Sequence, residues 1–229
     1  MCGMYDPSSR SRLTPRDLER FPDSTLFHSV ARVLCEAECL PRKELFESWE
    51  VARRVRRRLR GKRVLDLACG HALIANLMLL MDPEIESAVG VDKRIPKSAA
   101  LVREAFVAKW PRLAGKLALV EQPISAVEVR EGDFIVSCHA CGKLTDYVLD
   151  RAIAASAEVA VLPCCQATAI GDAGGLSGWL DPALAIDVTR AARLRAHGYR
   201  VHTQKIPEAM TAKNRLLFGE RIARPSDGM

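Results

Sequence analysis

From Lys62 onward, short apolar runs alternate with longer stretches of helical periodicity, and this alternation limits the possible folds most. Strands are predicted at residues 63–68, 87–91, 117–121, 133–137, 158–163 and 199–204. Helices are predicted over residues 72–81, 97–109, 142–155 and 182–197. Strands that alternate with helices favour a parallel sheet with helices on both faces. Residues 215–219 follow the sixth strand with no helix between, so we expect a seventh, antiparallel strand in a doubly wound, mostly parallel α/β sheet.

The residues before Lys62 follow a different pattern. Residues 1–24 are polar and rich in Ser, Arg, Pro and Asp, which is typical of a loosely held arm. Ser24 is the expected cap of a helix that runs from Thr25 to about Cys39. We therefore divide the chain into a flexible arm, N-terminal helices, an α/β domain and a tail: residues 1–24, 25–61, 62–220 and 221–229.

A second N-terminal helix is expected to start with Pro41, which suits the first helical position, and to end at Gly61. Its apolar residues recur every three or four positions and form one face: Leu45, Phe46, Trp49, Ala52, Val55 and Leu59. Its other side is basic, with Arg53, Arg54, Arg56, Arg57, Arg58 and Arg60. At its start, the segment Arg42-Lys43-Glu44 is a candidate to reach an anionic ligand at the edge of the sheet.

Composition narrows the class of protein. The chain has 229 residues, enough to bury a sizeable core, and its hydrophobic and charged fractions of 48% and 27% are ordinary for a globular domain. No apolar run approaches the roughly 18 residues of a membrane span, and the first residues do not resemble a secretory signal. We expect a cytoplasmic protein whose eight cysteines stay reduced, or serve metal binding or catalysis. The net charge of +6 is compatible with an anionic partner such as RNA.

A small-residue turn follows the first strand of the α/β domain. The strand runs into Asp66-Leu67-Ala68-Cys69-Gly70-His71-Ala72 and then directly into a helix. Small residues at alternate positions let the backbone turn tightly and approach a ligand closely. The second strand ends at Asp92, whose carboxylate can accept hydrogen bonds from both hydroxyls of a ribose. The further glycines of the nicotinamide fingerprint are missing, which disfavours a dehydrogenase.

The string VLDLACGHA resembles the first motif of class I S-adenosylmethionine-dependent methyltransferases, and AVGVD resembles their second. The resemblance covers about residues 41–220 and implies a Rossmann-like methyltransferase fold with S-adenosyl-L-methionine as cofactor. It differs from the usual first motif in having alanine at the first and third glycine positions, 68 and 72. The resemblance implies that Asp66 and the backbone around Ala68, Cys69 and Gly70 hold the methionine part, that Asp92 holds the ribose, and that the residues near Pro123 and Ile124 flank the adenine. His71, Lys93 and Cys138 are further candidate cofactor-binding residues.

Cysteines follow the fourth and fifth predicted strands, in the strings SCHACG (137–142) and LPCCQ (162–166). Neighbouring strands four and five would bring Cys138, Cys141, Cys164, Cys165 and His139 to one edge. These strings, and Thr211 to Arg215, are similar to the subgroup that includes eukaryotic tRNA ribose 2′-O-methyltransferases.

Four interpretations of the cysteine cluster remain open. His139 is a candidate general base or orienting group for an attacking hydroxyl. Cys165, or its neighbour Cys164, is a candidate nucleophile towards a pyrimidine ring. The Cys138/Cys141 spacing suits half of a zinc site, although the adjacent pair at 164–165 suits it poorly, so we assign no metal. The simplest interpretation is that the thiols are small buried residues that line the site.

The sequence thus predicts a methyltransferase that acts on RNA, with tRNA or rRNA as acceptor and RNA modification as its role. Arg53, Arg54, Arg57 and Arg58 are candidate phosphate contacts, although a run of charges is more often a solvated helix face. Two alternatives remain: methylation of a small molecule or protein, and a non-catalytic protein that uses the cysteines for metal or redox sensing.

Overall fold

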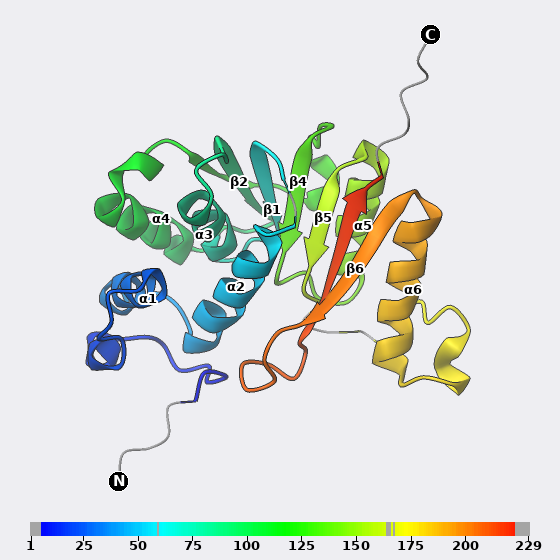
Figure 1. The fold of residues 1–229 in the computed structure, drawn as a ribbon, viewed down its shortest axis with the longest axis horizontal. Coiled ribbons are helices and arrows are strands. Elements are labelled where there is room, and N and C mark those ends of the chain that lie inside the picture. Colours follow the sequence, from blue (N-terminus) through cyan, green and yellow to red (C-terminus); the bar gives the residue numbers. More distant parts are fainter. Residues whose placement is uncertain (1–5, 59, 164–165, 167, 223–229) are drawn as a thin grey trace.

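The computed structural model describes residues 6–58, 60–163, 166 and 168–222 (Figure 1). They form a seven-stranded sheet with the order β3-β2-β1-β4-β5-β7-β6. Its strands are β1 (Arg63–Leu67), β2 (Ser87–Asp92), β3 (Leu117–Glu121), β4 (Asp133–Ser137), β5 (Glu158–Val161), β6 (Tyr199–Lys205) and β7 (Arg215–Arg221). The strands β1 to β5 pair in parallel, whereas β7 is antiparallel to both β5 and β6. The predicted fold class and the antiparallel last strand are therefore confirmed.

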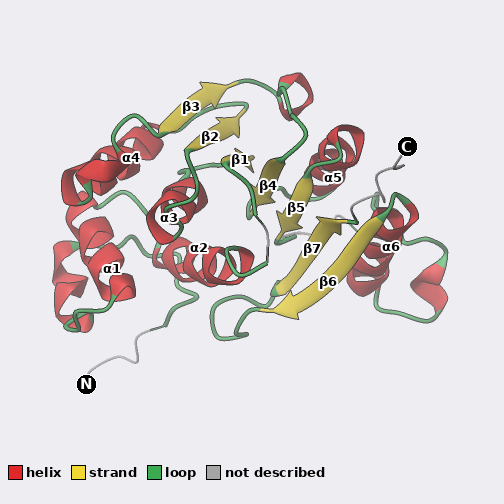
Figure 2. Ribbon diagram, turned by 45° about the horizontal axis from the view of Figure 1, so that its top comes forward, coloured by secondary structure: helices red, strands yellow, loops and turns green. Residues whose placement is uncertain are grey.

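Helices cover both faces of this sheet (Figure 2). One face carries α1 (Leu26–Ala37), α2 (Arg42–Val55), α3 (Leu73–Met81) and α4 (Lys97–Lys109), and the other carries α5 (Lys143–Ala155) and α6 (Pro182–Ala196). Neighbouring residues of β4 show how the sheet divides the core: Phe134 packs with α1–α4 and Ile135 with α5. Because side chains alternate along a strand, the apolar residues of β4 contribute to both layers of the core.

The N-terminal segment is ordered against the helices, which corrects the expectation of a loosely held arm for its described part, residues 6–24. Leu13 and Phe21 are buried in the larger core, and a short 3-10 helix spans Pro15–Arg20. The carboxylate of Asp17 accepts hydrogen bonds from the backbone and hydroxyl of Thr14. Two buried apolar residues, together with backbone hydrogen bonds to the start of α2, hold a segment whose composition is polar.

The limits of the N-terminal helices differ from the predictions at four points. Thr25, not Ser24, caps α1 by accepting a hydrogen bond from the His28 backbone N–H, and α1 ends at Ala37 rather than near Cys39. Pro41 is the N-cap of α2 and not its first residue, and α2 ends at Val55, well before Gly61.

Gly61 has a different role from the predicted helix end. A Cβ at this position would lie 3.0 Å from the carbonyl oxygen of Gly132 and 3.1 Å from Cβ of Phe134. Gly61 is thus required where the chain passes close to β4 just before entering β1. Leu59, expected on the apolar face of α2, lies outside the described residues.

The helices and strands of the α/β domain begin and end within two residues of the predicted limits, with β7 continuing to Arg221, into the expected tail. Within the described residues there are also four 3-10 helices: η1 (Pro15–Arg20), η2 (Pro111–Leu113), η3 (Ile124–Ala126) and η4 (Leu176–Gly178). In the part of the chain that the structure describes, no helix has the length and apolar character needed to span a membrane.

Candidate functional site

The turn between β1 and α3 is shaped by three left-handed residues at alternate positions. Ala68, Gly70 and Ala72 have φ angles of 57°, 50° and 55°. Glycine adopts this conformation freely, whereas alanine carries a cost of roughly 1–2 kcal/mol per residue. The two alanines therefore occupy positions where the backbone favours glycine, so this turn stores strain.

Hydrogen bonds at both ends of the turn hold this conformation. The Cys69 backbone N–H donates to the carbonyl of Val91 at 3.0 Å, which joins the turn to the end of β2. Asp92 accepts from the backbone N–H of Gly70 at 3.1 Å. The buried carboxylate of Asp66 accepts from the backbone N–H of Ala75, in the first turn of α3, at 3.3 Å. Burial raises the pKa of Asp66 to about 8, and the neighbouring Asp92 charge adds to this effect.

Gly90 in β2 explains how the turn can lie so close to the sheet. A Cβ at Gly90 would lie 3.2 Å from both the Cβ of Ala72 and the Sγ of Cys69. The backbone of β2 thus needs a glycine at this point for the turn to pack over it. Burial strongly raises the pKa of the Cys69 thiol, so Cys69 is an uncharged packing residue in this structure.

A cavity of about 440 Å³ opens beside the turn, and five of the predicted cofactor residues line it: Ala68, Asp92, Lys93, Pro123 and Ile124. They come from the ends of β1, β2 and β3, which meet at the carboxyl edge of the sheet. Most of the other walls are apolar, while Asp92 offers a carboxylate and Lys93 a cation. A cavity with mostly apolar walls and one carboxylate suits a nucleoside.

Three further lining residues were not predicted from the sequence. Ser125 directly follows Ile124 in the 3-10 helix η3, and Leu144 and Tyr147 both lie on α5. The two α5 residues reach the cavity because α5 packs beside η3, which starts at Ile124. Their spacing of three residues is a helix-face signal, but it does not indicate which cavity the face meets.

His71 lies in the turn, but protein groups engage both nitrogens of its ring. Its Nδ1 is 2.5 Å from the hydroxyl of Ser98, at the start of α4, and its Nε2 is 3.5 Å from a carboxylate oxygen of Glu44, in the first turn of α2. Burial lowers the pKa of His71, and the charge of Arg12 adds to this effect. His71 therefore links the turn to two helices.

His139 follows β4 and lies over the turn: its Cδ2 would be 3.9 Å from a Cβ at Gly70. Burial lowers the pKa of His139 to about 4, with contributions from the positive charges of His71 and Lys43. The imidazole is therefore neutral at neutral pH and able to accept a proton or a hydrogen bond.

The cysteine cluster is only partly described. Cys138 is buried and Cys141 is exposed, at the end of β4 as predicted, and β4 pairs with β5 as predicted. Cys164 and Cys165 lie outside the described residues, so the nucleophile and zinc hypotheses stay predictions. Among the described residues, no three His, Cys, Asp or Glu side chains gather as metal ligands.

The segment Thr211 to Arg215 closes the loop between β6 and β7 at the same edge. The Asn214 amide donates to the carbonyl of Ile206 at 3.0 Å, and Arg215 pairs with Asp187 of α6 at 2.7 Å. The buried Thr211 forms a hydrogen bond with Glu47 of α2. The segment therefore ties the loop to helices on both faces of the sheet, and Lys213 is left exposed.

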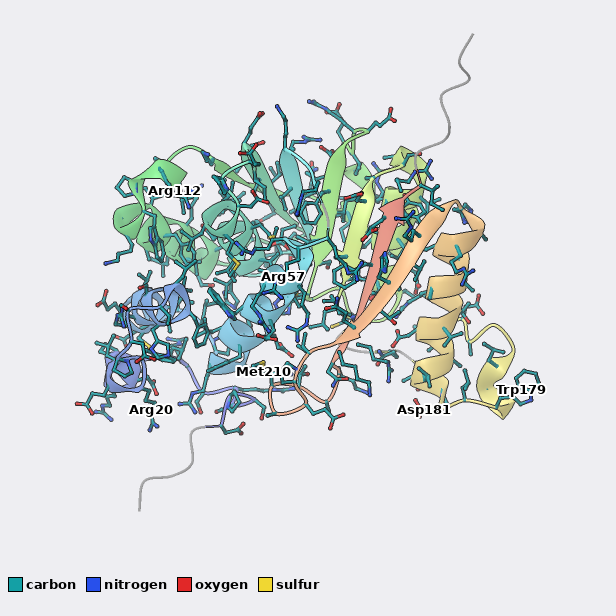
Figure 3. All side chains as sticks on the ribbon, viewed as in Figure 1. Arg20, Arg57, Arg112, Trp179, Asp181 and Met210 are labelled. Atoms are coloured by element: carbon teal, nitrogen blue, oxygen red, sulfur yellow. The ribbon has the colours of Figure 1, made fainter. Side chains whose placement is uncertain are left out.

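The predicted basic face divides into paired and unpaired arginines. Arg53 and Arg54 both pair with Glu50, and Arg58 pairs with Glu220 at 3.3 Å. Arg57 is exposed and is labelled in Figure 3, beyond the end of α2. Arg54 also donates to the carbonyl oxygen of Lys205, at the end of β6, at 3.4 Å, and none of these four arginines lines the cavity.

Comparisons with known proteins point to one family. A family model described as a methyltransferase domain matches residues 44–172. A comparison with curated protein sequences gives no match.

Solved structures share the fold at low sequence identity. An O-methyltransferase family protein from Burkholderia thailandensis has a TM-score of 0.53 and 17% identity, over 91% of this chain and 63% of that one. The methyltransferase domain of bacterial CtHen1-C has a TM-score of 0.55 and 15% identity, over 78% of this chain and 98% of that one. The mitomycin 7-O-methyltransferase MmcR has a TM-score of 0.51 and 15% identity, over 91% of this chain and 61% of that one. This chain thus spans less than two thirds of the first and third proteins.

Proposed function

We propose that this chain, which belongs to the methyltransferase-domain family, takes its methyl group from S-adenosylmethionine and transfers it to RNA, such as tRNA or rRNA. The observation that carries the acceptor proposal is a set of exposed cations at the carboxyl edge: Lys93, Lys143, Lys205 and Lys213. None of the four forms an ion pair with any residue that the structure describes.

The 440 Å³ cavity fits the nucleoside part of the cofactor. The Asp92 carboxylate would accept hydrogen bonds from the ribose hydroxyls, and Pro123, Ile124 and Leu144 would flank the adenine. The turn at Ala68–Gly70 would hold the methionine part through its backbone. Bound S-adenosylmethionine supplies an activated methyl group on a sulfonium.

The residues of the chain then have to orient the acceptor atom towards this methyl group and remove the proton of the acceptor. Since His139 lies over the turn and is neutral, one of its ring nitrogens would accept the proton of an acceptor hydroxyl or amine. A neutral imidazole is the form in which histidine acts as a base.

Two exposed aromatic side chains further support an RNA acceptor. Tyr147, on the rim of the cavity, is 57% exposed, and Trp179, on the segment between β5 and α6, is 89% exposed (Figure 3). Bases of single-stranded nucleic acids stack on such rings, with gains of about 1–3 kcal/mol per base. With the lysines, they provide the combination of stacking and charge that the aromatic-poor sequence does not reveal.

The test is incubation with isotopically labelled S-adenosylmethionine and total RNA, followed by digestion and nucleoside analysis. We expect label in a modified nucleoside, with the rate falling as salt rises because phosphate contacts release counterions. The Lys213→Ala variant should methylate RNA several-fold more slowly, whereas Lys109→Ala, an exposed lysine at the end of α4, should not. Label confined to small molecules or protein, with none in RNA, would contradict the acceptor proposal.

A further inference from the structure

Residues 9–13 lie across the start of α2 in a fixed position. The first backbone N–H groups of a helix lack partners within the helix, and Pro41 at the N-cap offers no side-chain acceptor. Here the carbonyls of Ser11 and Ser9 accept from Arg42 and Lys43 at 2.9 and 3.0 Å. The N-terminal segment therefore caps α2 in place of a side chain.

This capping places Arg12 near the turn after β1. Arg12 forms an antiparallel bridge with Pro41, three residues before Glu44, whose carboxylate contacts His71 of the turn. Its positive charge also contributes, after burial, to the lowered pKa of His71.

Arg12 is also the cation that remains available there. Of the two basic residues that open α2, Arg42 pairs with Asp17 at 3.2 Å and Lys43 pairs with Glu47 at 3.4 Å. Arg12 is exposed and forms no ion pair with any described residue. Arg42 and Lys43, predicted to reach the ligand, thus form ion pairs within the protein, whereas Arg12 forms none with any described residue.

Glu44 supplies the opposite charge at the same place. Its side chain is 20% exposed, and no Lys or Arg in the described part of the chain lies within salt-bridge distance of it. Burial, together with the Glu47 charge, raises the pKa of Glu44 to about 7. A nearby cation would favour its charged form.

We propose that Arg12 and Glu44 bind the charged amino-acid end of the cofactor, Arg12 its carboxylate and Glu44 its ammonium group. The inference rests on the cofactor site proposed above, because it requires the methionine part to extend from the turn at Ala68–Gly70 towards Arg12 and Glu44. The guanidinium of Arg12 can donate two parallel hydrogen bonds to a carboxylate. The half-buried Glu44 carboxylate is stabilised in its charged form when the ammonium group of the ligand binds beside it. Arg12 lies outside residues 44–172, so the N-terminal segment would contribute to the site from outside the matched domain.

Calorimetry with two ligands tests this proposal. S-adenosylhomocysteine has the amino-acid end, and 5′-methylthioadenosine has the same nucleoside without it. We expect Arg12→Gln and Glu44→Gln each to weaken S-adenosylhomocysteine binding about tenfold or more, and to change 5′-methylthioadenosine binding less than twofold. Arg16→Gln, an exposed arginine of the same segment, is the matched control and should alter neither affinity.

The outcomes separate this inference from the cofactor assignment. Equal loss of both ligands in the Arg12 variant, or no loss of S-adenosylhomocysteine, would overturn the role of Arg12. A weakening seen only for the RNA acceptor would also overturn it, since Arg12 would then contact a phosphate. If the unaltered protein bound neither ligand, the cofactor site itself would be wrong.

Discussion

The Gly70 backbone N–H donates to Oδ2 of Asp92 at 3.1 Å, and this bond joins the turn after β1 to the end of β2. The other oxygen of the Asp92 carboxylate accepts from the backbone of Arg94 at 3.3 Å. Asp92 therefore holds the turn in shape and also lines the cavity where a ribose would bind. One carboxylate serves both the architecture of the site and the recognition of its ligand.

Replacing Asp92 with Asn should weaken S-adenosylhomocysteine binding by about 10- to 100-fold, because a hydrogen bond to a charged group contributes roughly 1.5–3 kcal/mol. Isothermal titration calorimetry measures this change. The control is Glu84→Gln, an exposed acid just before β2, at the opposite edge of the sheet. Unchanged affinity in the Asp92→Asn variant would contradict the ribose assignment.

Ala68→Gly should leave the free energy of unfolding within about 0.5 kcal/mol of the original value. Relief of the left-handed strain, about 1–2 kcal/mol, offsets the lost methyl burial and the greater freedom of glycine in the unfolded chain. The comparison is Ala75→Gly, a buried alanine within α3, which should lose about 2 kcal/mol. Urea denaturation distinguishes the two, and equal losses would argue against strain at Ala68.

Glu44 should make the protein less stable as the pH rises. A carboxyl whose pKa is higher in the folded chain than in the unfolded chain binds more protons when folded, so its stabilising contribution is complete at low pH and lost as the pH rises. For Glu44 the loss falls between the unfolded value of about 4.3 and the folded value of about 7. The magnitude is of the order of 1–3 kcal/mol.

The measurement is urea denaturation of the ligand-free protein at pH 5 and pH 8. Glu44→Gln should reduce this dependence by the share of Glu44 and leave the share of Asp66, whose pKa is raised to about 8. Glu36→Gln, an exposed acid on α1, should preserve the full dependence. A variant that kept the full pH dependence would exclude Glu44 as its source.

His139→Gln should lower kcat by about 10²–10⁴-fold with little change in the affinity for S-adenosylhomocysteine, if His139 accepts the acceptor proton as proposed. Burial lowers the pKa of His139 to about 4, so activity should hold from pH 8 to pH 6 and fall only below about pH 5. The measurement is the methylation rate between pH 8 and pH 4, which shows at which pH activity falls. The control is His197→Gln, at the end of α6. A fall centred near pH 6.5 would point to another group.

The limits of the α/β elements were predictable because they depend on local signals. Apolar runs, glycines and the turn after Leu67 mark β1 to α4 to within two residues. The helix that was predicted to end at Gly61 shows where local signals fail. A side chain at Gly61 would collide with the backbone of Gly132 and with Phe134. These residues are some seventy positions away in the chain and are adjacent to Gly61 only in the folded sheet.

The sequence by itself determined the alternating sheet, the turn at Ala68–Gly70 and the carboxylate at Asp92, because each depends on residues within one strand–turn–helix unit. Only the tertiary structure decided what surrounds that turn. It fastened the polar N-terminal segment to the start of α2 through the carbonyls of Ser9 and Ser11, and it placed Arg12 beside Pro41, three residues before Glu44. The physical reason is that burial and long-range hydrogen bonds, which have no periodicity in the sequence, hold these parts together.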